Sequence, residues 1–451
     1  MAGPAVMALV DEGLGNSSYL VDLGDGRALA VDPPRDPTPH LALAERRGVT
    51  ISHTAETHLH ADFVSGSPEL ASRGATVLAP LEAAMAWPHR GLGDGDETDL
   101  GGLRLLALAT PGHTPEHLAY LLSDDDKPTA LFSGGSLLVG SVARTDLIAP
   151  DQTETLARAL WRSIVERLLT LPDDLAVYPT HGAGSFCSAP AGGERTTTIG
   201  RERATNPLLG APDEDTFVAR LFAGLGSYPP YFAELREVNR RGARVYGSFP
   251  TLAPLDVATT RQLAADGAAV VDVRPVDRFA AGHIPGSLSI PLRPQFAPWL
   301  GWLVRRDQSI VFVVDDDQDR VDLVRQCLTI GYERLAGELA GGLGAWTAEH
   351  QPVSVIPLVS PAALDPHQVL DVRQIAEYTA GHVPGAVHLE LGSLAPQLDA
   401  VPTGPITLMC GHGERAMTGA SILAAAGRKH LSVMVGGPDD WARAAGAPLA
   451  S

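Results

Sequence analysis

The stretch VLDVRQIAEYTAGHVPGAVHLEL (369–391) repeats an earlier stretch, VVDVRPVDRFAAGHIPGSLSIPL (270–292), and this repeat divides the chain. Two later pairs of blocks align in the same order: IVFVVDDDQDRV (310–321) with PITLMCGHGERAM (405–417), and GGLGAW (341–346) with GGPDDW (436–441). Three pairs in one order indicate a duplicated domain. Each copy reads as apolar strands alternating with glycine-containing loops and helices, which predicts an α/β unit on a mostly parallel sheet.

The duplication predicts the domain boundaries. The two copies occupy residues 251–352 and 353–451, and residues 1–250 form a separate domain in front of them. That front domain alternates short apolar strands with helical stretches such as 153–169, so it is also predicted to be α/β. Residues 211–250 are interpreted as a helical connector at its end.

The composition excludes several kinds of partner. A net charge of −19 repels phosphate backbones and anionic lipid surfaces, so neither nucleic acid nor a membrane is expected to bind. No apolar run suits a spanning helix, and the N-terminal MAGPAVMALVDEG lacks the basic region of a signal peptide. Three cysteines are too few for a disulfide framework, which favours a cytoplasmic location. The sequence leaves open whether the protein forms a homodimer.

The loop CGHGER (410–415) carries the clearest chemistry in the chain. It follows an apolar strand and opens a helix, so its backbone N–H groups and the helix N-terminus form an anion cradle. Such a cradle favours a thiolate at Cys410, and Arg415 can bind an anionic substrate oxygen. The alternative is a buried cysteine that packs as a small apolar residue.

These motifs resemble the rhodanese family of sulfurtransferases. The resemblance covers residues 353–451 through LDVR, GHVPGA, the Cys-x4-Arg loop and GGPDDW. It implies that Cys410 accepts sulfane sulfur from a donor such as thiosulfate and passes it on as a persulfide. The residues implied to bind the persulfide or the substrate, with Arg415, are Gly411, His412, Gly413, Glu414, Asp371 and Arg373.

The first copy differs at the decisive position. Asp315 stands where the second copy has Cys410, and three further aspartates follow it within 316–319. A carboxylate cannot carry sulfane sulfur, and the negative charges would repel thiosulfate-like anions. The first copy is therefore interpreted as an inactive rhodanese with a structural or docking role.

The stretch THLHADFVSG (57–66) in the front domain predicts a metal site. It holds His58, His60 and Asp62, while His113 and His181 follow later predicted strands. Strand ends are where α/β sheets expose functional groups, so these side chains are expected to meet. The alternative is a set of structural histidines.

Residues 1–250 resemble the metallo-β-lactamase fold, an αββα sandwich, and specifically its persulfide dioxygenase branch, which is fused to rhodanese domains. The motifs are NSSYLVD, AVDPP, ETHLHADFVSG, TPGHTPEHLAY, SGGSLLVGSVARTDL and YPTHGAGSFC. The resemblance implies one metal on His58, His60 and His113, and a second on Asp62, His181 and the position of Phe63. The dioxygenase branch holds one iron through the equivalents of His58 and His113 and an aspartate.

Two departures alter this expected site. Phe63 replaces a ligand of the second metal, and Gly135 stands where the aspartate belongs. The three histidines that remain suit one Fe(II) or Zn(II) ion, held weakly or not at all, with Asp62 as a substitute ligand. On this hypothesis Gly135→Asp should raise iron occupancy.

Four further residues are not predicted to be metal ligands. His117 is expected to face solvent or a carboxylate, and Cys187 to lie near the pocket as a packed residue or a contact for a thiol cofactor. Arg144 is predicted to form a supporting salt bridge with Asp146, or to bind a substrate carboxylate. Cys327 is expected in the core.

The sequence therefore favours an enzyme of sulfane-sulfur metabolism that acts on small thiols and persulfides such as glutathione persulfide and thiosulfate. Its rhodanese would work with a domain resembling a glutathione persulfide dioxygenase. Two alternatives remain for that front domain: zinc-dependent hydrolysis of a thioester, and a metal-free scaffold that delivers substrate or partners to Cys410.

Overall fold

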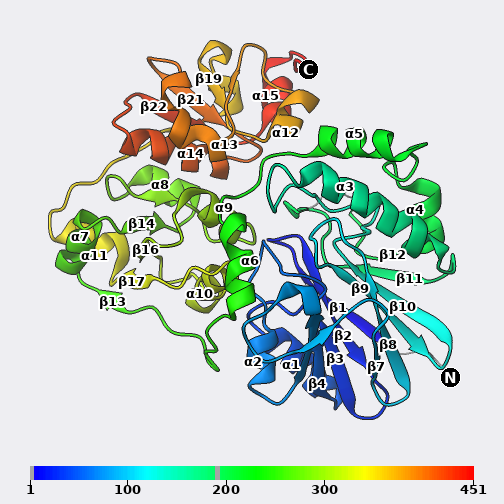
Figure 1. Cartoon of the computed structure of the whole chain (residues 1–451). Coiled ribbons are helices and arrows are strands. Elements are labelled where there is room, and N and C mark those ends of the chain that lie inside the picture. Colours follow the sequence, from blue (N-terminus) through cyan, green and yellow to red (C-terminus); the bar gives the residue numbers. More distant parts are fainter. Residues whose placement is uncertain (1–4, 188–192) are drawn as a thin grey trace. The chain divides into compact units, whose positions relative to one another are not determined.

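The structure is a computed structural model that describes residues 5–187 and 193–451. The first four residues of the N-terminal stretch considered above lie outside these ranges. The chain forms two compact units, Met1–Phe249 with Cys327–Gly331 and Pro250–Gln326 with Tyr332–Ser451 (Figure 1). Among the described residues, no helix has the length and apolar character needed to cross a membrane.

The first unit contains two six-stranded sheets. The first sheet has the order β1 (Val6–Asp11), β2 (Asn16–Asp22), β3 (Arg27–Val31), β4 (Thr50–Ala55), β5 (Thr76–Pro80), β6 (Arg90–Leu92). The second has the order β12 (Thr197–Thr198), β11 (Ala176–Pro179), β10 (Lys127–Gly134), β9 (Leu118–Asp124), β8 (Leu103–Ala109), β7 (Glu97–Asp99). Both sheets mix parallel and antiparallel pairs, for example β3 parallel to β4 and β8 antiparallel to β9.

The two sheets pack face to face because each buries an apolar face. Tyr19 and Val31 of the first sheet belong to the same core as Tyr120 and Phe132 of the second. The outer faces are covered by the helices α1 (Thr38–Arg47), α2 (Ser67–Ala71), α3 (Thr153–Arg162), α4 (Ile199–Thr205) and α5 (Glu214–Gly224) (Figure 1). The expected helix over 153–169 is α3 with an irregular last part, and the expected connector holds α5 and α6 (Phe232–Arg241).

The second unit contains two five-stranded parallel sheets with the same order of strands. The first copy has β13 (Pro254–Leu255), β17 (Leu335–Leu339), β16 (Ile310–Val313), β14 (Ala269–Asp272), β15 (Leu288–Ser289), and the second β18 (Leu358–Val359), β22 (Leu431–Met434), β21 (Ile406–Met409), β19 (Val369–Asp371), β20 (Val387–His388). The helices are α7 (Val257–Ala265), α8 (Val276–Ala281), α9 (Phe296–Leu303), α10 (Arg320–Thr329), α11 (Gly342–Ala348), α12 (Ile375–Ala380), α13 (Leu391–Leu394), α14 (Glu414–Ala425) and α15 (Pro438–Ala445).

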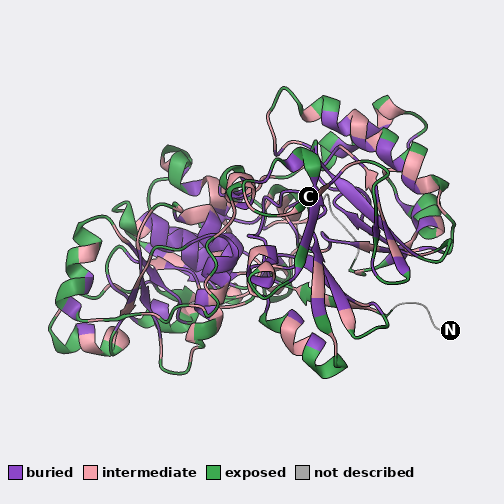
Figure 2. Cartoon of the chain, turned by 60° about the horizontal axis from the view of Figure 1, so that its bottom comes forward, coloured by how far each residue is buried: buried purple, intermediate pink, exposed green. Residues whose placement is uncertain are grey.

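The predicted fold class is confirmed: an αββα sandwich of two mixed sheets is followed by two parallel-sheet α/β domains. Figure 2 shows the inner strands largely buried and exposed residues on the helices, as hydrophobic burial requires. The candidate residues follow directly after buried strands, so their positions are fixed by the sheets.

Candidate functional sites

The predicted metal residues meet at one edge of the front domain. His58 and His60 follow β4, His113 follows β8, and His181 follows β11, as their sequence positions predicted. All four side chains are buried, with at most 1% exposure. Burial lowers the pKa of His58 and of His113 well below the usual value for histidine, so both rings are neutral at pH 7.

Hydrogen bonds decide which nitrogen of His58 faces inward. The Thr57 hydroxyl donates to Asp32 at 2.7 Å, so its oxygen can only accept from the His58 Nδ1–H group, 2.8 Å away. Thr180 also donates to the Asp32 carboxylate. The Nε2 atom of His58 therefore carries the free lone pair.

The same logic holds for His113 and His181. His113 donates from Nδ1 to the carbonyl oxygen of Arg144 at 2.7 Å. His181 donates from Nδ1 to the Asn16 side-chain oxygen at 3.1 Å, while the Asn16 amide donates to Asp62 at 2.8 Å. Metal-binding histidines typically donate their other ring N–H group to a protein oxygen in this way. Both residues therefore turn an Nε2 lone pair toward the centre.

These inward lone pairs fit a cation. The Nε2 atoms of His58 and His181 lie 3.4 Å apart, and the His113 Nε2 atom is buried with no hydrogen-bond partner. Two nitrogens bound tetrahedrally to zinc lie about 3.3 Å apart, whereas two facing lone pairs without a cation repel each other. The residues present therefore fit a metal ion.

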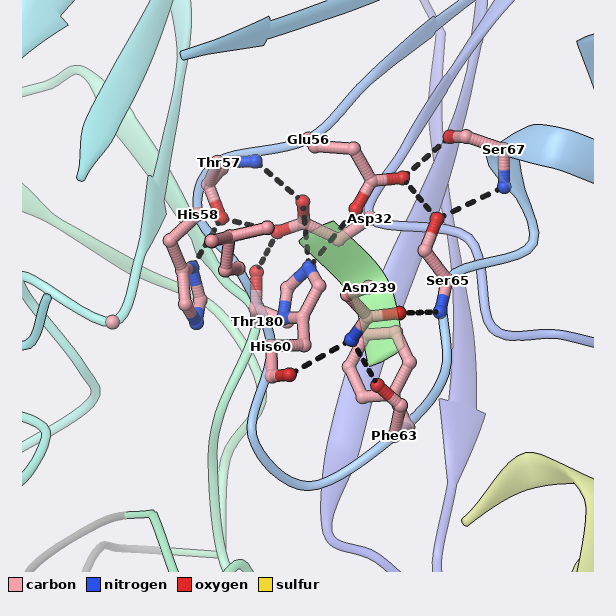
Figure 3. A network of polar contacts seen from close by, with 12 residues as sticks. Asp32, Glu56, Thr57, His58, His60, Phe63, Ser65, Ser67, Thr180 and Asn239 are labelled. Atoms are coloured by element: carbon pink, nitrogen blue, oxygen red, sulfur yellow. Dashed lines mark hydrogen bonds and ion pairs between the residues drawn. The ribbon is translucent and has the colours of Figure 1, made fainter. Parts of the chain in front are cut away.

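His60 lies in the same cluster but is held differently (Figure 3). Its Nε2 atom lies 3.2 Å from Asp32 and 3.3 Å from Glu56. Burial opposes the charged ring, yet these two carboxylates raise the pKa of His60 to about 10. Its Nδ1 atom has no hydrogen-bond partner, so His60 offers a ligand atom only after losing a proton.

Phe63 fills the place of the missing second-metal ligand. Its ring is buried and stacks on His60 with centroids 4.2 Å apart. The surrounding loop is fixed by Asn239 of α6, which donates to the carbonyl oxygens of His60 and Phe63 at 2.8 and 2.9 Å and accepts from the Ser65 N–H group (Figure 3). Asn239 could not be identified from the sequence, because no local motif marks it.

Asn239→Ala is expected to destabilise the front domain by roughly 2–5 kcal/mol, because it leaves three buried backbone groups without partners. Differential scanning calorimetry measures the loss. The matched control is Glu237→Gln on the same helix, whose side chain contacts only the exposed Arg240 and Arg241. Equal melting temperatures for Asn239→Ala and the unmodified protein would contradict the role of Asn239.

The surroundings of Gly135 are filled. A Cβ atom there would lie 2.5 Å from Cδ2 of His113 and 3.2 Å from Ala143. His117 accepts from the Gly135 N–H group at 2.9 Å, and its Nδ1 contacts Thr110 at 2.8 Å. Burial lowers the pKa of His117 to about 3. The prediction that His117 faces solvent is wrong, because the ring is buried and contacts the backbone N–H group of Gly135.

Asp62 and Arg144 support the cluster. Asp62 lies 3.4 Å from the His181 Nδ1 atom; burial opposes its charge, but His181 and His60 hold the pKa of Asp62 below its usual value. Arg144 forms the predicted salt bridge with Asp146 at 2.7 Å, and its guanidinium also donates to two carbonyl oxygens. Binding of a substrate carboxylate by Arg144 stays a prediction.

The Cys410 loop places one backbone donor against the cysteine sulfur, and the wider anion cradle stays a prediction. It joins β21 to α14, and the Gly413 N–H group donates to Cys410 Sγ at 3.1 Å. Gly413 has φ = 119°, a conformation that favours glycine. The Gly411 carbonyl passes so close to Gly437 that a side chain there would clash at 2.6 Å.

Arg415 at the end of this loop is paired with a residue that the sequence did not suggest. Its guanidinium donates to the Glu377 carboxylate at 2.6 and 2.8 Å and lies 5.9 Å from the Trp299 ring centroid. Asp371 and Arg373 form a buried ion pair at 2.7 Å, and Arg373 also holds the Gly381 carbonyl. These contacts favour a structural role for Asp371 and Arg373. Substrate binding by these two residues stays a prediction.

In the first copy, the corresponding loop forms an ion pair and hydrogen bonds with arginine side chains. Asp315 pairs with Arg278 at 2.6 Å, and Arg320, which aligns with Arg415, donates to the carbonyl oxygens of Asp315 and Gln318 at 2.7 and 2.9 Å. A loop whose carbonyl oxygens hold a cation does not present an anion cradle.

A cleft of about 410 Å³ opens beside the Cys410 loop. His412 and Glu414 of the loop line it together with residues of the first copy, among them Asp277 and Arg293. Arg293 lies 3.4 Å from Glu414. The first copy therefore contributes a cation and part of the wall to the surroundings of the active loop.

Known proteins support both halves of this description. The metallo-beta-lactamase superfamily model matches residues 9–181, and the rhodanese-like domain model matches residues 256–349 and 360–444. The human mitochondrial persulfide dioxygenase ETHE1 is 32% identical over 43% of this chain and 70% of its own length. The hydroxyacylglutathione hydrolase of Rhizobium meliloti is 31% identical over 48% of this chain and 91% of its own.

A solved structure covers more of the chain. The metallo-beta-lactamase of Staphylococcus aureus is 30% identical with a TM-score of 0.67, over 75% of this chain and 99% of that one. The two-sheet sandwich and the two duplicated α/β domains thus agree with the matched families. The chain belongs to the metallo-beta-lactamase superfamily, in a form related to persulfide dioxygenases and hydroxyacylglutathione hydrolases and followed by two rhodanese-like domains.

Proposed function

We propose that the second rhodanese-like domain is a sulfurtransferase that carries sulfane sulfur on Cys410. The observation behind this proposal is the 3.1 Å hydrogen bond from the Gly413 N–H group to Cys410 Sγ at the start of α14. Backbone N–H groups and the positive end of a helix stabilise a thiolate, and they stabilise the terminal sulfur of a persulfide for the same reason.

The proposed reaction balances without an external oxidant or reductant. The Cys410 thiolate attacks the outer sulfur of thiosulfate, the S–S bond of thiosulfate breaks, and sulfite leaves with the bonding electron pair. The persulfide on Cys410 then gives its outer sulfur to a thiolate, sulfite or cyanide, which restores the Cys410 thiolate. Arg293 places a cation in the adjacent cleft, where an anionic donor would enter.

Mass spectrometry of the full-length protein tests this proposal. After incubation with thiosulfate, the peptide that contains Cys410 should gain the mass of one sulfur atom, and cyanide should remove it. The peptides of Cys187 and Cys327 serve as internal controls, because both thiols are buried outside the loop. An unmodified Cys410 peptide would reject the proposal.

The carboxylate of Asp315 in the first copy is expected to be dispensable for sulfur transfer. Asp315→Ala should leave thiocyanate formation from thiosulfate and cyanide within a few-fold of the unmodified rate, because the carboxylate only pairs with Arg278. Arg278→Ala breaks the same ion pair from the other side and is the matched control. Loss of activity in Asp315→Ala, with a folded protein, would assign an active role to this loop.

We infer that the front domain binds one divalent metal ion between His58, His113 and His181, with His60 and Asp62 beside them. A bound metal ion would supply positive charge and open coordination positions. Two relatives act, by name, on a persulfide and on a hydroxyacyl-glutathione, which supports a glutathione-derived substrate. Glutathione persulfide is the first candidate, since its oxidation yields sulfite that the Cys410 persulfide converts to thiosulfate.

Thioester hydrolysis is the second candidate, and Gly135 favours it. The filled space at Gly135 leaves no room for the carboxylate that the dioxygenase branch uses. Metal analysis combined with two assays separates the candidates. Iron with oxygen uptake on glutathione persulfide supports the first, and zinc with hydrolysis of a hydroxyacyl-glutathione thioester supports the second. A metal-free, inactive domain would leave only the scaffold role.

A further inference from the structure

The histidine cluster also contains a thiol. The Sγ atom of Cys187 and one ring nitrogen each from His113 and His181 lie within 4.8 Å of one another. All three side chains are buried, and Cys187 has no exposed surface. A cysteine alone does not make a site, but here two inward-facing imidazole nitrogens stand beside it.

Each histidine has one ring nitrogen near the thiol and uses its Nδ1 atom for a contact with the protein. His113 Nε2 is buried without a hydrogen-bond partner, because the ring donates from Nδ1 to Arg144. His181 likewise uses Nδ1 for Asn16, which leaves its Nε2 atom available. A buried nitrogen lone pair without a donor is costly unless a cation or a donor meets it.

One residue of the backbone fixes both the thiol and a histidine. The Arg144 carbonyl accepts from the His113 ring at 2.7 Å, and the Arg144 N–H group donates to the Cys187 carbonyl at 2.8 Å. The Cys187 N–H group also donates to the Ser185 hydroxyl at 3.2 Å. These contacts hold the backbone of Cys187 beside the residue that orients the His113 ring.

The Cys187 thiol can supply the negatively charged metal ligand that a glycine at position 135 cannot. The His113 ring and the Ala143 side chain fill the space that a carboxylate at position 135 would need. A site of neutral imidazoles alone carries no negative ligand, whereas a cysteine becomes anionic when a metal displaces its proton.

We propose that Cys187 is a thiolate ligand of the front domain, in a set of His113, His181 and Cys187 that takes a thiophilic divalent cation, zinc before iron. Binding breaks the S–H bond, and the proton leaves to solvent as the metal–sulfur bond forms. Sulfur and imidazole donors suit zinc, and in this set Cys187 takes the place given above to His58 as the third protein ligand, so a fourth position stays open. This inference rests on the proposed metal binding by the front domain.

Cobalt(II) loading of the full-length protein tests the inference. The unmodified protein should show a thiolate-to-cobalt charge-transfer band in the near ultraviolet, and Cys187→Ser should lose the band and bind zinc about 10–100-fold more weakly. Cys327→Ser and Cys410→Ser are the matched controls and should keep both properties. A band that persists in Cys187→Ser would overturn the inference.

X-ray absorption at the zinc edge provides a measurement that needs no substitution. Zinc-loaded unmodified protein should show one sulfur neighbour at about 2.3 Å. Metal bound by nitrogen and oxygen alone would overturn the thiolate ligand and leave the proposed metal site standing; the thiol would then only contact Asp62. Failure to bind any metal would overturn both, while sulfur on Cys410 would remain testable by mass spectrometry.

Discussion

Cys410→Ser should lower the rate of thiocyanate formation from thiosulfate and cyanide by at least about a thousandfold. A serine hydroxyl cannot form a persulfide, and no other described residue on the Cys410 loop offers sulfur. The substitution removes one polarisable atom and keeps the size of the side chain, so the Gly413 contact and the start of α14 should survive. Stopped-time colorimetry of thiocyanate measures the effect.

The controls for this experiment come from the same chain. Cys187→Ser and Cys327→Ser should keep the full rate, because Cys327 is buried in the core, as expected, and Cys187 lies in the front domain. Circular dichroism of all three variants checks that each is folded. Retained activity in Cys410→Ser, or loss of activity in Cys327→Ser with an intact fold, would place the sulfur carrier elsewhere.

Gly135→Asp should weaken metal binding by about 10–100-fold, the opposite of the gain in iron that the sequence suggested. The new Cβ atom would lie 2.5 Å from Cδ2 of His113, so the ring must leave its position. His113 would then lose its hydrogen bond to Arg144 and the direction of its Nε2 lone pair. Metal content after dialysis against a competing chelator measures the change.

The control for the glycine substitution is Gly210→Asp. A Cβ atom on Gly210 meets only ordinary contacts with Pro207 and Asn206 oxygens, beyond 3.5 Å, so the same change of charge should leave metal content unaltered. If Gly135→Asp instead raised iron content and oxygen uptake with glutathione persulfide, the expectation that Gly135 marks a missing iron ligand would be correct and the steric argument at His113 wrong.

The sequence alone singled out the Cys410 loop as the candidate for sulfur transfer because the residues that suggest this chemistry lie within six consecutive positions. A strand, a tight loop and a helix start are local features, so Cys410, Gly413 and Arg415 could be placed by reading 405–417. The comparison between the two copies then isolated Asp315 as the decisive difference. The fold class followed for the same reason, since repeated motifs and strand spacing are properties of the chain itself.

The metal cluster could be predicted only in part. That His58, His113 and His181 would meet followed from their places after strands. Which of their nitrogens face inward depends on Thr57, Arg144 and Asn16, and these contacts join different elements of the fold.

Tertiary packing also decided what surrounds the cluster. His117 was expected to face solvent or a carboxylate, but its ring occupies the space where a side chain at Gly134 would lie, and it accepts from the Gly135 N–H group. Asn239 holds a loop more than a hundred residues earlier, and Cys187 reaches His113 through the backbone of Arg144. Sequence spacing carries local geometry, whereas the direction of a lone pair and the filling of a vacant position are set by residues that only folding brings together.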